Sequence, residues 1–283
     1  MRLIDSHSHL QAEAFASDRA AVVAAARAGG VERLLVPGWD AASSVAARAL
    51  AAEYGWIDAA AGIHPHEAAV ATEADWATVV NLASEPDIVA IGETGLDFDR
   101  MHSPREAQLD NLRRHLRLAL ETGKPAILHC RSEAGSQDAQ DALLVELQSA
   151  GMGEAAARGA FGQRPPAVLH SFSGSVAYAA AAIDLGLAVS FGGLVFRRGE
   201  EASAEVAKLV PVERLLIETD APFLAPPGVP RAGVPGFAGR RNSPEWVHIT
   251  ARWLSEQRGG TPDSIGDSLV AAYDNTFRRH SGG

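Results

Sequence analysis

The chain has 283 residues, of which 47% are hydrophobic and 21% charged, proportions typical of a globular protein with a large core. Its formal net charge of −10 argues against a broad basic surface for nucleic acid. A local anion site stays open, because bound metal ions bring their own positive charge. The single cysteine, Cys130, excludes an internal disulfide. No signal-peptide pattern follows Met1 and no stretch reaches the roughly 18 apolar residues of a membrane span, so we expect a cytoplasmic protein that does not enter membranes.

Short apolar stretches alternate with longer amphipathic segments along almost the whole chain. The apolar stretches predict strands at Leu3–His9, Arg33–Pro37, Ile57–Ile63, Asp87–Glu93, Ala126–Cys130, Ala167–Phe172, Leu187–Phe191 and Arg214–Asp220. The amphipathic segments predict helices at Asp18–Ala28, Ala41–Tyr54, Glu73–Ser84, Pro104–Thr122, Ser136–Ser149, Val176–Leu185, Glu200–Leu209, Pro244–Gln257 and Pro262–Arg279. Eight such units in about 220 residues favour a TIM-type (β/α)8 barrel over a doubly wound open sheet. We expect one domain over residues 1–283, with extra C-terminal helices.

Two segments interrupt this alternation. Gly151–Pro166 is rich in Gly, Ala and Pro and is predicted to be a surface loop. Ala225–Asn242 has no periodicity and is predicted to be a long loop after the last strand. Because the loops that follow the strands build the active face of such a barrel, the second loop is expected beside any functional site.

His7 and His9 follow the start of the first predicted strand, in the sequence Asp5-Ser6-His7-Ser8-His9. Side chains alternate faces along a strand, so the two imidazoles point the same way, about 6–7 Å apart, with Asp5 beneath them. This pair alone leaves two interpretations open, a solvated edge strand or a divalent metal ion bound at the strand end. The ends of the other strands are needed to choose between them.

Polar residues end several other predicted strands in the same way. They are His64, His66, Glu93, His129, His170 and Asp220. Six of the ten histidines therefore stand where apolar strands stop, on the face where barrel enzymes keep their chemistry. Imidazoles and carboxylates gathered there predict a metal centre. The remaining histidines fall on predicted helices or near a terminus and are expected to be solvated: His102, His115, His248 and His280.

The sequence around these residues resembles the successive motifs of the TatD family of metal-dependent hydrolases. The similar segments, in the family's order, are Asp5–His9, Gly62–His66, Ile91–Asp97, His129–Arg131, His170–Ser175, Glu218–Leu224, Arg240–Pro244 and Asn275–Arg279. The resemblance spans nearly the whole chain. Two segments depart from the family pattern by their length, Gly151–Pro166 and Ala225–Gly239, and both are expected to border the substrate groove.

The resemblance implies an amidohydrolase-like barrel with a two-metal site. One ion would be held by His7, His9 and Asp220, and the other by His129 and His170. Glu93 would bridge the two ions. A bridging carboxylate offsets part of the repulsion between two cations about 3.5–4 Å apart. The ligand types favour Zn or Mn whereas the family description favours Mg, so the sequence leaves all three metals open. Asp5 is then expected to support the ligands from behind.

The same resemblance implies a phosphodiesterase of the deoxyribonuclease type, an exonuclease acting on ends of single-stranded DNA. Asp220 and Glu93 are the implied catalytic residues, with Asp220 accepting a proton from a water activated by two metals. His64 and Arg131 match positions that face the substrate. Arg241 and Asn242 belong to an element that either helps to bind the substrate, as we expect for Arg241, or serves structure. In an acidic chain we expect a short single strand to bind locally, and the sequence indicates no obligate protein partner.

Two other functions compete with the nuclease. An amide, ester or lactone hydrolase would use the same binuclear site, but no lysine ends a strand to serve as a carboxylated bridge, which favours the nuclease. A barrel that has lost catalysis predicts missing ligands, and all six are present. Five aromatic residues are candidates for stacking on bases, although core packing is expected for most of them: Trp39, Phe172, Phe196, Phe223 and Trp246.

Overall fold

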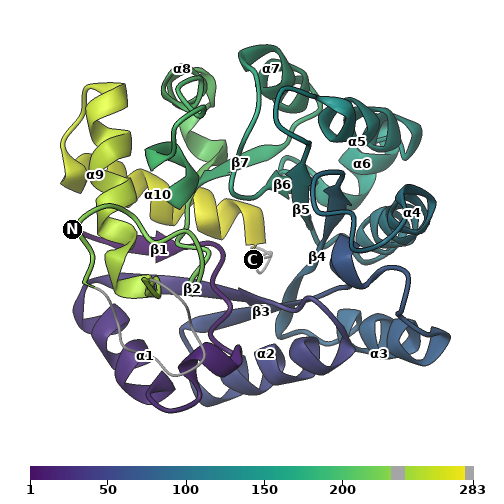
Figure 1. Cartoon of the computed structure of the whole chain (residues 1–283), viewed down its shortest axis with the longest axis horizontal. Helices are drawn as coiled ribbons and strands as arrows, with labels where there is room; N and C mark the ends of the chain where they lie inside the picture. The colour runs from purple at the N-terminus through teal and green to yellow at the C-terminus, as the bar shows by residue number, and fades with distance from the viewer. Residues whose placement is uncertain (231–239, 278–283) are drawn as a thin grey trace.

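The computed structural model describes residues 1–230 and 240–277, and its eight strands form one parallel sheet in the order β1 to β8. The strands are β1 Leu3–Asp5, β2 Val31–Pro37, β3 Ile57–Ala61, β4 Ile88–Asp97, β5 Ala126–Arg131, β6 Ala167–Leu169, β7 Ala188–Phe191 and β8 Leu215–Ile217. The sheet returns on itself, because Ser6 N–H donates to the Ile217 carbonyl at 3.0 Å and His9 N–H donates to the Ala221 carbonyl at 2.7 Å. The predicted TIM-type barrel is confirmed (Figure 1).

Helices surround the barrel on the outside (Figure 1). They are α1 Arg19–Ala28, α2 Ala41–Glu53, α3 Glu73–Ala83, α4 Arg105–Thr122, α5 Asp138–Ser149, α6 Ala155–Phe161, α7 Val176–Asp184, α8 Ser203–Leu209, α9 Val247–Arg258 and α10 Pro262–Phe277. Local sequence sets their ends: Asp40 forms a capping box at the start of α2, and Gly123 ends α4 in the left-handed conformation. α10 packs beside the start of β1, where a side chain on Gly266 would collide with the carbonyl of Arg2.

The strands that lead to functional residues differ in length from the prediction: β3, β6 and β8 end earlier than predicted, at Ala61, Leu169 and Ile217. β1 ends at Asp5 and not at His9, because the backbone beyond Asp5 divides its hydrogen bonds between two neighbours. Ser8 N–H donates to Leu35 of β2 at 3.0 Å, whereas His9 N–H donates toward the β8 side. β4 continues past Glu93 to Asp97, because its later residues pair with β5 in a register that sets Asp97 opposite Arg131.

The two predicted loops have different outcomes. The segment Gly151–Pro166 contains the helix α6, so the prediction of a loop is wrong there: Ala157 and Phe161 bury their side chains and give the segment an apolar face. Of the predicted loop Ala225–Asn242, residues 231–239 lie outside the described residues, and the described parts on either side contain no helix or strand. The end of the predicted last helix, Arg278 and Arg279, also lies outside them, as does His280.

One continuous hydrophobic core fills the barrel and the space between strands and helices. Leu34, Leu35 and Val36 of β2 are all buried, as expected for a parallel strand covered on both faces. Within the described ranges, no helix combines the length and apolarity needed to cross a bilayer. Buried polar side chains such as Glu93 and His170 interrupt the core at the C-terminal ends of the strands, and that is where the candidate site lies.

Candidate metal centre

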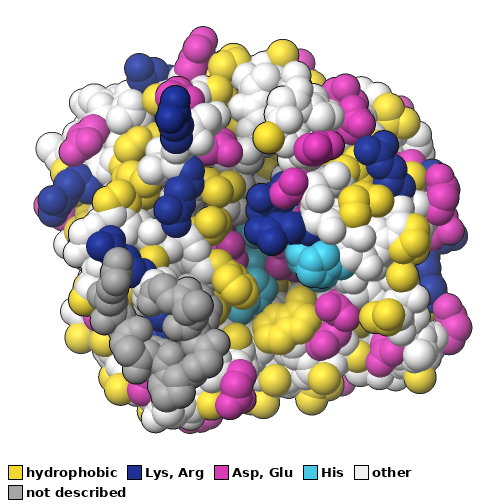
Figure 2. Space-filling model, in the orientation of Figure 1, with side chains coloured by type: hydrophobic (Ala, Val, Ile, Leu, Met, Phe, Trp, Pro, Cys, Tyr) yellow, Lys and Arg dark blue, Asp and Glu magenta, His cyan; other side chains and the backbone are white. Residues whose placement is uncertain are grey.

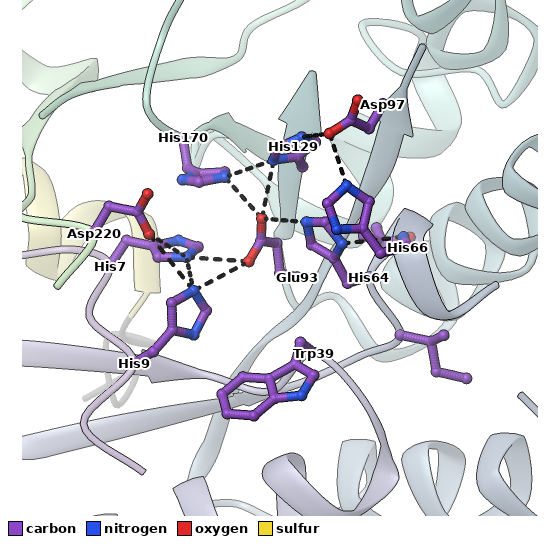
Figure 3. A network of polar contacts seen from close by, with 12 residues as sticks. His7, His9, Trp39, His64, His66, Glu93, Asp97, His129, His170 and Asp220 are labelled. Carbon is purple, nitrogen blue, oxygen red and sulfur yellow. Dashed lines mark hydrogen bonds and ion pairs between the residues drawn. The ribbon is translucent and has the colours of Figure 1, made fainter. Parts of the chain in front are cut away.

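Glu93 lies at the centre of a group of buried polar side chains at the C-terminal ends of the strands (Figure 3). Its Oε2 lies 3.2 Å from Nε2 of His7 and 3.5 Å from Nε2 of His9. Its Oε1 lies 3.2 Å from Nδ1 of His129 and 2.9 Å from Nε2 of His170. A single carboxylate therefore joins two groups of imidazole nitrogens.

The first set consists of His7, His9 and Asp220, which come from the two sides of the barrel closure. The Nε2 atoms of His7 and His9 are 3.2 Å apart. Oδ1 of Asp220 lies 3.9 Å from Nε2 of His7 and 3.6 Å from Nε2 of His9. The backbone holds the set together, because Asp220 N–H donates to the carbonyl of His7 at 2.8 Å. Asp220 has a φ of 54°, a left-handed conformation that aspartate tolerates better than most residues.

The second set consists of His129, which lies on β5, and His170, which follows the neighbouring strand β6. Nδ1 of His129 lies 3.4 Å from Nε2 of His170. Each ring places its other nitrogen against a carboxylate: Nε2 of His129 lies 3.2 Å from Oδ2 of Asp97, and Nδ1 of His170 lies 3.2 Å from Oε1 of Glu218. Carboxylates in this position fix the tautomer and orientation of a metal-binding imidazole and raise its basicity.

The histidines of the first set have no such support. Nδ1 of His7 and Nδ1 of His9 are buried without a hydrogen-bond partner among the described residues. Asp5, which was expected to support them from behind, accepts the Thr219 N–H at 2.9 Å and the Thr219 hydroxyl at 2.6 Å. Burial raises the pKa of Asp5 to about 8, against the effect of these bonds. Asp5 thus joins β1 to the segment after β8 and supports the ligands through the backbone.

His64 also contacts Glu93, and its own hydrogen bonds fix its tautomer. Its Nε2 lies 3.2 Å from Oε1 of Glu93, while its Nδ1 accepts the N–H of His66 at 3.1 Å. Burial lowers the pKa of His64 to about 4, so the ring is neutral at neutral pH. Because Nδ1 accepts a bond, the proton is on Nε2 and is donated toward Glu93. His64 therefore presents a donor to the site, whereas His7, His9, His129 and His170 present lone pairs or exchangeable protons.

The two sets have opposite pKa shifts. Burial lowers the pKa of His7 and brings that of His9 to about 3, and in each case a neighbouring histidine adds to the effect. Burial opposes protonation of His129 and His170 as well, but the carboxylates overcome it, so the pKa of His129 is raised and that of His170 lies well above its ordinary value. Burial by itself raises the pKa of Glu93, but the histidines around it, His170 first, hold it well below its ordinary value.

Asp220 is the exception among the carboxylates of the site. Burial raises its pKa well above the ordinary value, and the charge of Glu93 adds to this against the opposing effect of His170. In the metal-free site the pKa shifts therefore favour protonation of different kinds of group, the carboxyl of Asp220 in the first set and the imidazoles of His129 and His170 in the second.

The donor set fits divalent metal ions. Ligand atoms lie within 4.8 Å of one another in three overlapping groups: His7, His170 and Asp220; His7, His9 and Glu93; and His64, Glu93 and His129. Imidazole nitrogens suit Zn and Mn, and the carboxylate oxygens suit these ions and Mg. The Nε2 atoms of His7 and His9 lie 3.2 Å apart, and a cation near both would accept a lone pair from each ring once its proton is on Nδ1.

Glycine brings β3, β4 and β5 close enough to build this site. A Cβ on Gly62 would collide with the backbone of Gly92, and one on Gly95 would collide with the carbonyl of His129. Gly95 also has a φ of 137°, which side chains rarely allow. The absence of side chains here lets β4 pass between its neighbours and sets Glu93 beside His129.

The two arginines predicted to face substrate have different surroundings. Arg131 ends β5, its side chain is 48% exposed, and its Nε lies 2.7 Å from Oδ2 of Asp99. Arg241 is buried: its guanidinium donates to both carboxylate oxygens of Asp18, at 2.8 and 2.6 Å, and stands 4.7 Å over the ring of Phe15. These contacts fasten the segment before α9 to the start of α1, which is the structural role that the sequence left open beside substrate binding for Arg241.

His115 corrects a second expectation. It is buried and not solvated: its Nε2 accepts the N–H of Ile63 at 3.0 Å and its Nδ1 donates to the carbonyl of Asn111 at 2.7 Å. It lies on the buried stripe of α4 with Leu112 and Leu116, and that periodicity was the available signal. His102 is exposed as expected, and its ring stacks 4.3 Å from that of His66.

Two residues with clear places in the site, Asp97 and Glu218, were given no role in the sequence analysis. Asp97 accepts hydrogen bonds from both His129 and His66, the latter at 2.8 Å between Oδ2 and Nε2. Glu218 supports His170. Strand pleating was the available signal: Asp97 lies four residues after Glu93 on β4, and Glu218 lies two residues before Asp220, so each shares a face with a predicted ligand.

Comparison with known proteins agrees with this geometry. A family model described as TatD related DNase matches residues 4–278. The chain belongs to this TatD family. It is therefore a metal-dependent hydrolase with a His, Glu and Asp cluster able to bind metal.

Individual relatives of the TatD family match over almost their full lengths. A Klebsiella pneumoniae protein named 3'-5' ssDNA/RNA exonuclease TatD is 37% identical over 261 residues, with 90% of this chain and 91% of that protein covered. A Bacillus subtilis protein named as an uncharacterized metal-dependent hydrolase, YabD, is 34% identical over 276 residues, covering 98% and 99%. The crystal structure of YJJV, a TatD homolog from Escherichia coli, superposes with a TM-score of 0.81 at 28% identity, covering 99% of both chains.

Proposed function

We propose that this TatD-family hydrolase holds two divalent metal ions and cuts phosphodiester bonds at the ends of single-stranded nucleic acid. The observation that carries the proposal is the position of Glu93, whose two oxygens face different sets of imidazoles. The proposed ligands of the first ion are His7, His9 and Asp220, and those of the second are His129 and His170. Glu93 is a ligand of both ions.

The chemistry divides between the metals and the protein. When bound, the divalent cations supply polarisation of a phosphoryl oxygen and a lowered pKa for a water molecule. Asp220 accepts the proton of the attacking water, because its raised pKa makes it a stronger base than an ordinary aspartate and its side chain, 13% exposed, reaches the open side of the site. His64 directs its Nε2–H into the site, where it donates to a phosphate oxygen, and Arg131 binds the phosphate from the rim.

The surroundings of the site suit a single strand more than a duplex. Figure 2 shows histidine side chains on the floor of a hollow, with Lys or Arg side chains on one border and hydrophobic side chains on the other. The net charge of −10 leaves little attraction for a long duplex outside this hollow. Relatives of similar sequence are named exonucleases of single-stranded DNA and RNA, which supports a strand end as the substrate.

The test is digestion of 5'-labelled single-stranded DNA and RNA of the same sequence by protein supplied with Mg²⁺, Mn²⁺ or Zn²⁺. We expect a ladder of products shortened from one end, and Asp220→Ala to lower the rate by on the order of 1000-fold. Asp110→Ala removes an exposed carboxylate on α4 and serves as the matched control. Intact strands with all three metals, or an Asp220→Ala variant as active as the parent, would refute the proposal. A parallel panel of aryl esters, amides and lactones identifies the alternative hydrolase.

A further inference from the structure

Two aromatic side chains lie beside the same histidine. The ring of Trp39, which follows β2, lies 5.4 Å from that of His9 at an angle of 74°. The ring of Phe223, which follows β8, lies 6.1 Å from that of His9 at 72°. Because β2 and β8 are the two neighbours of β1, each contributes one aromatic ring beside a proposed metal ligand.

The exposure of these rings is unusual for the chain. Phe223 is 51% exposed and is the one aromatic residue among the exposed large hydrophobic side chains of the described ranges. Trp39 is half-buried, and in Figure 3 its indole lies beside His9 and Glu93. Phe172, another candidate for stacking, is 2% exposed and belongs to the core. Exposed aromatic area at the mouth of a catalytic hollow indicates a ligand with an apolar face.

The other side of Glu93 has the opposite character. His129 and Arg131 lie on β5, and the guanidinium of Arg131 is half-exposed at the rim. A single strand of nucleic acid that crosses the site therefore meets aromatic rings beside the first set and a cation beside the second. A nucleotide has the same division, with a flat apolar base at one end and a charged phosphate at the other.

We propose that Trp39 and Phe223 form an aromatic subsite that stacks on the nucleobase next to the bond being cut, while Arg131 holds the backbone phosphate on the other side of Glu93. The subsite rests on the proposed nuclease function and adds the part of the substrate that is recognised. Since every base has a π-face, it binds all four bases with little preference. It explains an exposed phenylalanine beside a set of metal-binding groups.

The experiment uses two single strands of identical sequence that differ only at the terminal nucleotide of the digested end. One strand ends in an ordinary nucleotide, and the other ends in an abasic tetrahydrofuran residue. We expect the metal-loaded parent protein to cut the abasic end with a kcat/KM about ten-fold lower, mainly through KM. Phe223→Ala is expected to lose a similar factor on the ordinary end only, so that it treats the two strands alike, and Phe223→Trp to restore the difference.

The outcomes separate the subsite from the nuclease function. Equal kcat/KM values of the parent protein on the two strands overturn the subsite and leave the nuclease function in place. A Phe223→Ala variant that slows both strands by the same factor also overturns the subsite, because the ring then acts on the site and not on the base. Failure of the parent protein to cut the ordinary strand overturns the nuclease function itself. Val212→Ala trims an exposed side chain before β8 and is the control for loss of apolar surface.

Discussion

The two halves of the metal centre use the same chemical groups but position them by different means. His129 and His170 each rest against a buried carboxylate, so side chains fix their rings. His7 and His9 have no partner for Nδ1 among the described residues, and the backbone bonds across the barrel closure hold them in place. The two halves of the proposed two-metal site therefore have no symmetry in their supporting residues: one half depends on a side-chain network, and the other depends on the fold itself.

The largest effect is expected from Glu93, the residue that both halves share. Glu93→Gln removes one negative charge from the space between two cations and turns one acceptor oxygen into a donor. We expect phosphodiesterase activity to fall by on the order of 1000-fold with Mg²⁺, Mn²⁺ and Zn²⁺ alike. Metal content per chain, measured by atomic emission, should fall below that of the parent. Full activity in this variant would show that the halves work independently.

The supporting carboxylates test the difference between the halves directly. Asp97→Asn and Glu218→Gln are each expected to weaken metal binding at the second set by about 10–100-fold, because His129 or His170 loses basicity and orientation. Competition with a chromophoric chelator measures this affinity. Asp58→Asn is the matched control, since Asp58 is a buried carboxylate on β3 that accepts from Tyr273 at 2.9 Å, remote from the C-terminal strand ends. Unchanged affinity in both variants would remove the proposed distinction.

Protonation sharpens the comparison. The pKa values of His170 and Asp220 are raised well above their ordinary values, and at any pH below them a metal ion must displace a proton from each group, so apparent affinity rises with pH by about ten-fold per unit for each proton displaced. His170→Ala and Asp220→Asn should each abolish about one released proton, detected by calorimetry in buffers of different ionisation enthalpy. At metal concentrations that still fill the first set, His9→Ala should leave proton release unchanged, because the lowered pKa of His9 keeps it neutral. If all three variants lost the same number of released protons, the assignment of these protons to His170 and Asp220 would be contradicted.

His115 provides a reference histidine outside the metal centre, with the smallest expected effect. Burial lowers its pKa from 6.5 to about 4, so the unfolded chain binds a proton in this range that the folded chain does not. The contribution of His115 to stability is therefore complete above pH 6.5 and is lost as the pH falls toward 4, by about 1 kcal/mol per unit. When the free energy of unfolding of metal-free protein is measured with urea at several pH values, His115→Gln should lack this part of its pH dependence. An identical pH dependence of the unfolding free energy in the parent protein and in His115→Gln would contradict the prediction.

The sequence was enough to predict the barrel and the convergence of the six proposed ligands. Apolar strands that end in His, Glu or Asp must bring those residues to one face once the barrel is known. The short span of β1 was not predictable, because it depends on where the first strand meets both its neighbours. The extension of β4 depends on Gly95 fitting against the carbonyl of His129, a contact between strands that no local pattern shows.

The roles of Arg241 and α6 were missed for a related reason. Arg241 finds Asp18 and Phe15 only after the chain has closed, and a cation beside ligand motifs in the sequence gives no sign of a distant ion-pair partner. The glycines and prolines between residues 151 and 166 hide a short helix whose stability comes from burying Phe161. Tertiary contacts decided both outcomes.

The bond between Asp220 N–H and the carbonyl of His7 has a consequence for biosynthesis. The first strand made by the ribosome carries two of the proposed metal-binding residues, but their carboxylate partner and their backbone support arrive only with the last strand. A nascent chain that ends before β8 therefore lacks the geometry of the first set, whatever metal surrounds it. The capacity to cut nucleic acid is completed late in synthesis, when the ends of the sheet meet.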